Sequence, residues 1–227
     1  MENHSIQARW EAAHEERRFR PVYPHEQVVR WVFRDLERNA KPKMKVLDLG
    51  CGAGRHAIFL ANEGFDVSAC DFSAVGLREL GKSARKSGLA IPTHQTPAHN
   101  LSHYANDSFD AVLCFGVMYY LTLDEAEQTI SEVSRVLRSG GKFFCVTRSD
   151  GDSRLLNATS LGRCAWHINA LEPGAPSAME EDIDMLFVSK EDIERIFSPF
   201  TNLCVDRMTY THEGFVNDDW IVIAAKP

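Results

Sequence analysis

The segment Lys45–His56, KVLDLGCGAGRH, decides how the rest of this chain is interpreted. An apolar run that contains one acid, Asp48, is followed by three glycines at every second position. This pattern predicts a buried strand, a tight loop and a helix, because glycine is favoured where the backbone needs a positive φ or where a ligand packs against bare main chain. A second acid, Asp71, follows the next apolar run, Phe65–Cys70. In a strand–loop–helix–strand unit that carboxylate lies beside the glycine loop, where it can accept hydrogen bonds from a ribose. The sequence therefore predicts a site for a nucleoside-containing cofactor.

The glycine spacing separates the possible cofactors. A dinucleotide site has the pattern Gly-x-Gly-x-x-Gly, whereas here the third glycine, Gly54, comes one residue early and Arg55 takes its place. Asp48 would also repel a pyrophosphate, while it suits a ligand with an ammonium or another cationic centre. A nicotinamide-dependent oxidoreductase is therefore disfavoured.

The stretch Val46–Gly54, VLDLGCGAG, resembles the first motif of the class I S-adenosylmethionine-dependent methyltransferases. The resemblance extends from about Val28 to the C-terminus and is to members that act on small molecules. It implies S-adenosyl-L-methionine as the cofactor. It also implies a sheet whose last strand is inserted antiparallel.

The resemblance assigns roles around the cofactor. Gly50 and Gly52 would approach its methionine part, Asp48 would place its amino group, Asp71 would bind the ribose hydroxyls and Phe72 would pack on the adenine. The other predicted cofactor contacts are Cys51, Ala98, Cys114, Phe115 and Tyr23. The chain departs from the family at Pro97, which stands where an acid usually binds the adenine edge. Recognition is left to the Ala98 backbone, with His99 either a second contact or a loop histidine.

The acceptor side is predicted less sharply. Tyr119 and His167 are the candidate catalytic residues, and the candidate substrate contacts are Tyr120, Arg148, Arg154 and Trp166. The segment Thr147–Arg154 is equally well interpreted as a solvated loop, and a tryptophan in a long insertion is more often an anchor for a lid.

The order of apolar runs and helical patterns predicts an α/β fold, with strands over 46–49, 66–70, 90–95, 110–115 and 142–147 and helices over 54–63, 74–87 and 124–138. We expect a doubly wound, mostly parallel seven-stranded sheet with helices on both faces. A C-terminal antiparallel hairpin is expected from strands over 203–211 and 219–225. Residues 1–40 are predicted to form an N-terminal helical lid. Residues 41–227 would form the cofactor-binding domain, with 151–187 as an irregular substrate-side insertion.

Composition limits the partners. The net charge is −7 over 227 residues, which disfavours a large nucleic-acid-binding surface. No apolar run approaches the ~20 residues of a membrane span, and the N-terminus lacks the pattern of a secretory signal. The six cysteines form no C-x-x-C pair and the nine histidines are scattered, which indicates free thiols in a reducing compartment and no metal site. A cytoplasmic monomer or homodimer that binds neither membrane nor nucleic acid is expected.

These observations predict a methyltransferase acting on an oxygen or nitrogen of a small polar metabolite, with a sugar or nucleotide sugar as the preferred acceptor. Two alternatives stay open at this point. One is a protein or RNA methyltransferase, and the other is a regulator that binds S-adenosylmethionine without catalysis.

Overall fold

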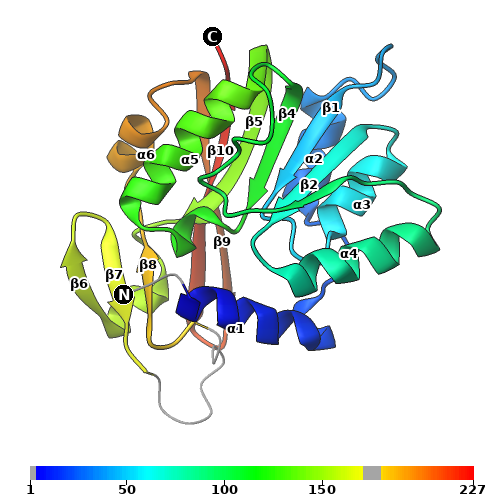
Figure 1. Ribbon diagram of the computed structural model, residues 1–227. Coiled ribbons are helices and arrows are strands. Elements are labelled where there is room, and N and C mark those ends of the chain that lie inside the picture. The colour runs from blue at the N-terminus through cyan, green and yellow to red at the C-terminus, as the bar shows by residue number, and fades with distance from the viewer. Residues whose placement is uncertain (1–3, 171–179) are drawn as a thin grey trace.

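The computed structural model describes residues 4–170 and 180–227, which form a central sheet flanked by helices and a smaller sheet at one end (Figure 1). The helical elements are α1 (His4–Glu15), η1 (Arg17–Phe19), α2 (Glu26–Asp35), α3 (Arg55–Asn62), α4 (Ala74–Lys86), η2 (Met118–Tyr120), α5 (Leu123–Val136), η3 (Ser153–Asn157) and α6 (Lys190–Ile196). The strands are β1 (Lys45–Leu49), β2 (Asp66–Asp71), β3 (Thr93–Gln95), β4 (Phe109–Phe115), β5 (Leu137–Arg148), β6 (Ala158–Gly162), β7 (Ala165–Ile168), β8 (Ile183–Leu186), β9 (Thr201–His212) and β10 (Phe215–Ala225).

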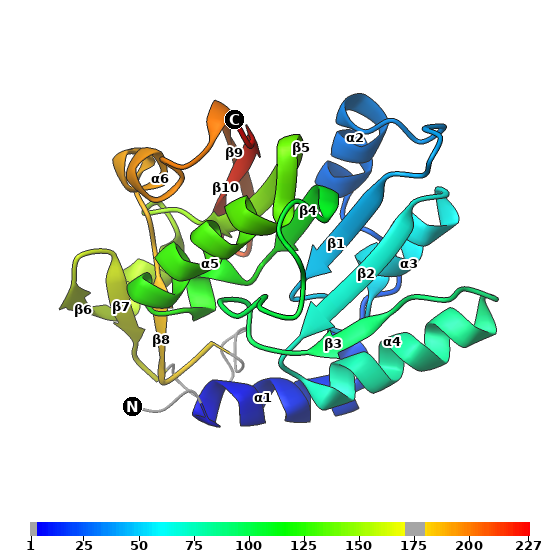
Figure 2. The ribbon, with the colours of Figure 1, turned by 45° about the horizontal axis from the view of Figure 1, so that its top comes forward.

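The main sheet has seven strands in the order β3-β2-β1-β4-β5-β10-β9 (Figure 2). Strands β3, β2, β1, β4 and β5 are parallel neighbours, whereas β10 runs antiparallel to both β5 and β9. The predicted α/β class and the C-terminal hairpin are therefore confirmed. Ligands of such sheets bind beyond the carboxyl ends of the parallel strands, which places Asp71, Phe115 and Arg148 at the same edge of the sheet.

The central strands β1 and β4 are buried on both faces, and their side chains alternate between two cores. Val112 and Cys114 belong to the core under α5 and α6, whereas Ala111 and Leu113 belong to the core under α2, α3 and α4. Because successive strand residues point to opposite faces, a continuous apolar run such as AVLC is what a two-sided sheet requires.

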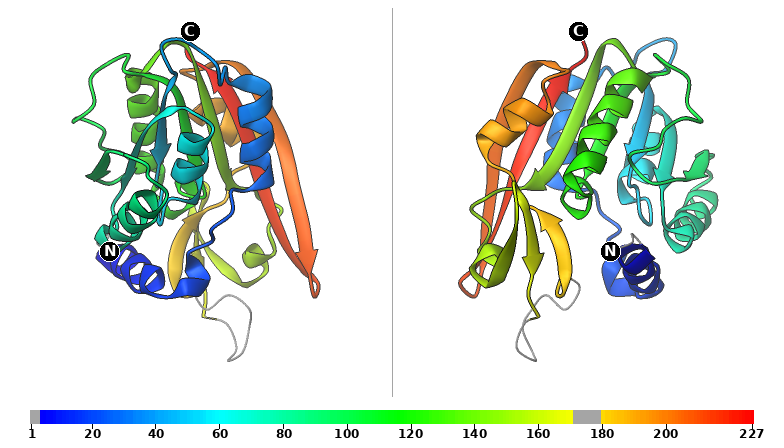
Figure 3. Two further views of the ribbon diagram at one scale, coloured as in Figure 1. Left: turned by 90° about the vertical axis from the view of Figure 1, so that its right-hand side faces the viewer. Right: turned by 60° about the vertical axis from the view of Figure 1, so that its left-hand side comes forward.

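Two parts of the prediction need correction. The strand expected over 142–147 begins at Leu137 directly after α5, and the described residues of 151–187 are not irregular. They contain η3 and a second antiparallel sheet of β6, β7 and β8, which Figure 3 shows below the main sheet. Four of the five residues of β6 are exposed, so that strand has no alternating apolar pattern that would reveal it. The expected insertion also includes residues 171–179, which lie outside the described residues.

Helix α1 crosses the sheet edge at which β1 and β2 end, between α4 and the smaller sheet (Figures 1 and 2). Within the described ranges, no helix is long and apolar enough to cross a bilayer.

Candidate functional site

The loop between β1 and α3 has the backbone that its glycines predict. Gly50, Gly52 and Gly54 have φ values of 70°, 51° and 85°, a region that other residues rarely adopt. Gly50 and Cys51 both donate a backbone hydrogen bond to the Cys70 carbonyl, at 2.8 and 3.0 Å. A Cβ on Gly50 would collide with the Val117 side chain. The loop is thus fixed to β2 and packed under the segment that follows β4.

Asp71 lies at the end of β2, with its carboxylate against the glycine loop. Its Oδ2 accepts a hydrogen bond from Gly52 N at 2.7 Å, and its Oδ1 accepts one from Ser73 N at 2.8 Å. Burial raises the pKa of Asp71 to about 6, although the backbone donors at Ser73 and Gly52 oppose that rise. Each carboxylate oxygen keeps a second lone pair, so Asp71 can still accept hydrogen bonds from a ligand.

Asp48 is buried beneath the loop with an unsatisfied atom. The residue is 1% exposed, and its Oδ2 makes no hydrogen bond to any residue that the structure describes. Burial raises the pKa of Asp48 to about 7. The carboxylate accepts a backbone hydrogen bond from Ala57, so Oδ2 is the oxygen that lacks a partner. A buried oxygen without a partner is costly, and a cationic group of a ligand would compensate it. The residues at this loop therefore fit the ammonium group of S-adenosylmethionine.

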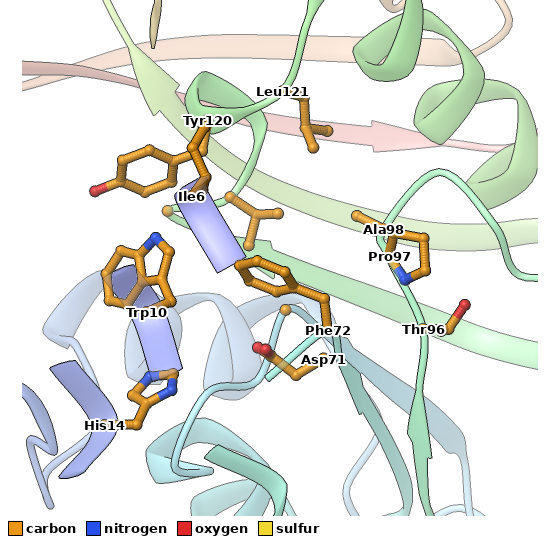
Figure 4. A pocket seen from close by; sticks show the side chains of 13 residues that line it. Ile6, Trp10, His14, Asp71, Phe72, Thr96, Pro97, Ala98, Tyr120 and Leu121 are labelled. Carbon is orange, nitrogen blue, oxygen red and sulfur yellow. The ribbon is translucent and has the colours of Figure 1, made fainter. Parts of the chain in front are cut away.

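Two cavities meet above the loop. The first, of about 100 Å³, is lined by residues of the sheet edge and of α1 and is called the nucleoside cavity below; Figure 4 shows its lining. Its lining comprises Ile6, Trp10, His14, Gly50, Asp71, Phe72, Thr96, Pro97, Ala98, Gly116, Val117, Tyr120 and Leu121. The second, of about 210 Å³, shares Trp10, Gly50 and Gly116 with it and also contacts Cys51, Gly52, Phe115 and Tyr119. Of the predicted cofactor contacts, Gly50, Cys51, Gly52, Asp71, Phe72, Ala98 and Phe115 lie at these two cavities.

Helix α1 is attached to the first turn of α4. The Glu11 carboxylate accepts hydrogen bonds from Ala74 N and Val75 N, both at 2.9 Å, and from the Ser73 hydroxyl at 2.9 Å. Ser73 Oγ in turn accepts from Gly76 N, as the N-cap of α4. Helix N-termini have backbone donors without partners and a partial positive charge, so the acid of α1 is well placed there.

A third cavity, of about 420 Å³, lies between α1, the start of α5 and the smaller sheet, and is called the acceptor-side cavity below. It shares Ile6, Tyr120 and Leu121 with the nucleoside cavity. Its polar lining includes His167, whose Nδ1 is 2.8 Å from Asp184 Oδ1 and whose Nε2 is 3.4 Å from Asp182 Oδ1. Tyr120 and His167, which the sequence placed on the acceptor side, therefore line one cavity.

A buried network of charged side chains lies behind the two tyrosines. Arg154 binds the carboxylates of Asp152 and Glu180, and its guanidinium also donates to Asn217. Arg148 binds Asp219 at 2.9 Å, and its Nη2 lies 3.5 Å from Glu180 Oε1. The hydroxyl of Tyr120 donates to the same Glu180 oxygen at 2.7 Å.

This network corrects the prediction that Arg148 and Arg154 contact substrate. Both are buried and lie at none of the described cavities. Their guanidinium groups donate hydrogen bonds to the carboxylates of the network. They hold the acceptor side together. The segment that carries them is also no solvated loop, because the bidentate partner Asp152 is 2% exposed.

Three further predicted contacts lie elsewhere. Tyr23 is 83% exposed, away from every described cavity, because the prolines on both sides hold that segment extended at the surface. Cys114 is fully buried in the core under α5 and α6. Trp166 packs against the cluster of Tyr119, Ile168 and Met185. Successive residues of a strand point to opposite faces, so Trp166 and its neighbour His167 do not share a face of β7.

Neither tyrosine can serve as a base at neutral pH. Burial raises the pKa of Tyr119 to about 12, and burial beside Glu180 raises the pKa of Tyr120 further above its ordinary value. Both therefore keep their protons.

The sequence prediction missed the residues of α1 that cover the nucleoside cavity. Ile6, Trp10 and His14 are spaced four residues apart and so share one helix face, and all three line the cavity together with Asp71 and Phe72 (Figure 4). That spacing is visible in the sequence. What it does not reveal is the cavity that the face covers.

Comparison with known proteins agrees with this geometry. Residues 46–141 match a family model described as a methyltransferase domain. A demethylmenaquinone methyltransferase of Beutenbergia cavernae is 36% identical over 45% of this chain and 40% of its own length. Residues 46–141 are thus similar to a methyltransferase domain, and the chain spans less than half the length of that relative.

Solved structures show the same fold over nearly the whole chain. A methyltransferase of Methanosarcina mazei superposes with a TM-score of 0.70 at 19% identity, over 90% of this chain and 98% of its own. The magnesium protoporphyrin IX methyltransferase of Synechocystis, with bound S-adenosylhomocysteine, superposes with a TM-score of 0.62 at 18% identity, over 98% of this chain and 85% of its own. Identity this low shows the fold alone.

Proposed function

We propose that this protein transfers a methyl group from S-adenosylmethionine to an oxygen or nitrogen of a small polar metabolite. The observation that carries the proposal is the unpaired, buried Asp48 Oδ2 beneath a glycine loop whose neighbouring acid, Asp71, can accept from a ribose. Similarity to a demethylmenaquinone methyltransferase and to a magnesium protoporphyrin IX methyltransferase supports a small-molecule acceptor.

Bound S-adenosylmethionine supplies an activated methyl group on a sulfonium. The chain must therefore hold an acceptor in line with that methyl and exclude water. Trp10, Tyr119 and Tyr120 are suited to this task, since the Trp10 and Tyr120 rings meet at 5.3 Å and the two tyrosine rings at 4.5 Å. We assign residues 1–40 to a lid over this site and residues 41–227 to the domain that it covers.

Proton removal is assigned to His167. Asp184 orients its ring, and imidazole is the side chain best matched to proton transfer near neutral pH. Tyr119 keeps its proton and can donate a hydrogen bond to an acceptor oxygen. The carboxylates of the acceptor-side cavity can accept from sugar hydroxyls, which supports a sugar as acceptor. Because Asp182 and Asp184 would repel a diphosphate, a neutral sugar is favoured over a nucleotide sugar.

Calorimetry with S-adenosylmethionine, S-adenosylhomocysteine and NAD tests the cofactor. Micromolar binding of the first two, lost in Asp71→Ala, is expected. Binding of NAD alone would overturn the proposal. Isotope-labelled methyl transfer to a panel of sugars, amines and carboxylic acids then tests the reaction. Tight cofactor binding without transfer to any of them would indicate a regulator, and labelling only of protein or RNA would indicate a macromolecular substrate.

A further inference from the structure

His14 of α1 occupies an unusual position beside the nucleoside cavity. It is 5% exposed and lines that cavity opposite Asp71 and Phe72 (Figure 4). Its Nε2 lies 3.1 Å from the point where a Cβ on Gly52 would stand, and its Nδ1 lies 2.9 Å from the corresponding point on Gly76. The ring thus enters a gap that two glycines leave open. One of them, Gly76, lies inside a helix, where glycine is unfavourable by about 1 kcal/mol relative to alanine.

The hydrogen bonds around Ser73 fix which nitrogen of His14 carries the proton. The single hydroxyl proton of Ser73 is donated to the Glu11 carboxylate. The Ser73 oxygen, 3.0 Å from His14 Nδ1, must therefore accept from that nitrogen. A neutral imidazole with a proton on Nδ1 has a lone pair on Nε2.

The ring is held in that neutral form. Burial lowers the pKa of His14 below its ordinary value, and the charge of Arg20 acts in the same direction, while Glu11 opposes both. Within residues 4–170 and 180–227, no donor forms a hydrogen bond to Nε2 of His14. A ring nitrogen without a protein partner at the wall of a cavity is available to a donor on the ligand.

We propose that His14 is a cofactor-binding residue whose Nε2 accepts a hydrogen bond from one ribose hydroxyl of the nucleoside, on the side of Gly52 opposite the Asp71 carboxylate. The assignment rests on the proposed function, because it requires the nucleoside part of S-adenosylmethionine in this cavity. It makes ribose recognition a joint property of β2 and α1. The hydrogen bonds that join Glu11, Ser73 and His14 connect that recognition to the contact between α1 and α4.

The test is a thermodynamic cycle in which the His14 side chain and one ribose hydroxyl of the ligand are each removed, alone and together. Calorimetry measures the Kd of S-adenosylhomocysteine and of its 2′-deoxy and 3′-deoxy analogues for the wild type and for His14→Phe, which keeps a ring but removes the acceptor. His14→Phe should weaken S-adenosylhomocysteine about tenfold, the effect of one hydrogen bond. Against the analogue that lacks the contacted hydroxyl, wild type and variant should agree within about twofold.

His14→Leu removes the acceptor with a different shape and should show the same hydroxyl-specific loss. His212→Phe, at an exposed histidine of β9, is the matched control and should bind all three ligands like the wild type. The proposal is overturned if the His14 variants weaken all three ligands by one factor, as a structural role would, or weaken none. Failure of the wild type to bind any of the three would instead overturn the proposed function.

Discussion

The two sides of the site are built on different principles. On the cofactor side the contacts are made by main chain and by residues close in sequence, such as Gly52 N to Asp71 and Gly50 N to the Cys70 carbonyl. On the acceptor side they are charged side chains far apart in sequence, such as Arg148 with Asp219 and Arg154 with Glu180. The first arrangement leaves a local motif, whereas the second depends on the completed fold. The contacts of the cofactor side can therefore persist when the sequence of the acceptor side changes.

The test of this contrast with the largest expected effect removes one charge from the acceptor side. Arg154→Met leaves Glu180 and Asp152 buried with fewer partners. Breaking a buried ion pair from one side typically costs about 3–5 kcal/mol. We expect a loss of this size in the free energy of unfolding measured with urea. Arg163→Met is the control. The ion pair of Arg163 within the described part of the chain is an exposed one with Glu127, and such pairs contribute about 0–1 kcal/mol. Similar losses for both variants would show that the network does not hold the acceptor side together.

An intermediate test addresses the buried acid of the cofactor side. The pKa of Asp48 is about 7 because of its burial, so below pH 7 a cationic cofactor must displace a proton from it. We expect the Kd of S-adenosylmethionine to be about tenfold weaker at pH 6 than at pH 8, because the ionised fraction of Asp48 falls about tenfold one pH unit below its pKa. Calorimetry in two buffers of different ionisation enthalpy would also detect the released proton.

The same shift has a consequence for stability. A carboxyl whose pKa is raised by folding, from 3.8 to about 7, contributes stability that is present below the lower value and lost as the pH rises through the higher one. The ligand-free protein should therefore lose stability between about pH 4 and pH 7. Asp48→Asn should flatten both pH profiles. A wild-type Kd that is constant from pH 6 to pH 8 would contradict the role given to Asp48.

The sequence revealed the two sides unequally for a physical reason. Glycines at positive φ and an acid at the end of a strand are local requirements, so residues 45–72 predict both the sheet and the position of Asp71. The pairings of Arg148 with Asp219 and of Arg154 with Asn217 join positions 71 and 63 residues apart. No local pattern encodes such partners. The sequence therefore predicts substrate contacts for the arginines of residues 148–154, although the fold buries them against Asp152, Glu180 and Asp219.

The test with the smallest expected effect concerns α1, which contacts both sides. Glu11 binds the first turn of α4, on the cofactor side, whereas Arg9 donates to the carbonyls of Glu181 and Asp182 at 2.6 and 3.1 Å, on the acceptor side. Removing an acid from a helix N-terminus typically costs about 0.3–1 kcal/mol. Glu11→Gln should therefore weaken S-adenosylhomocysteine about twofold to fivefold. Arg9→Met should leave that Kd within about twofold. Equal losses in the two variants would mean that α1 acts as one rigid lid over both sides. The division between a cofactor side and an acceptor side would then not apply to this helix.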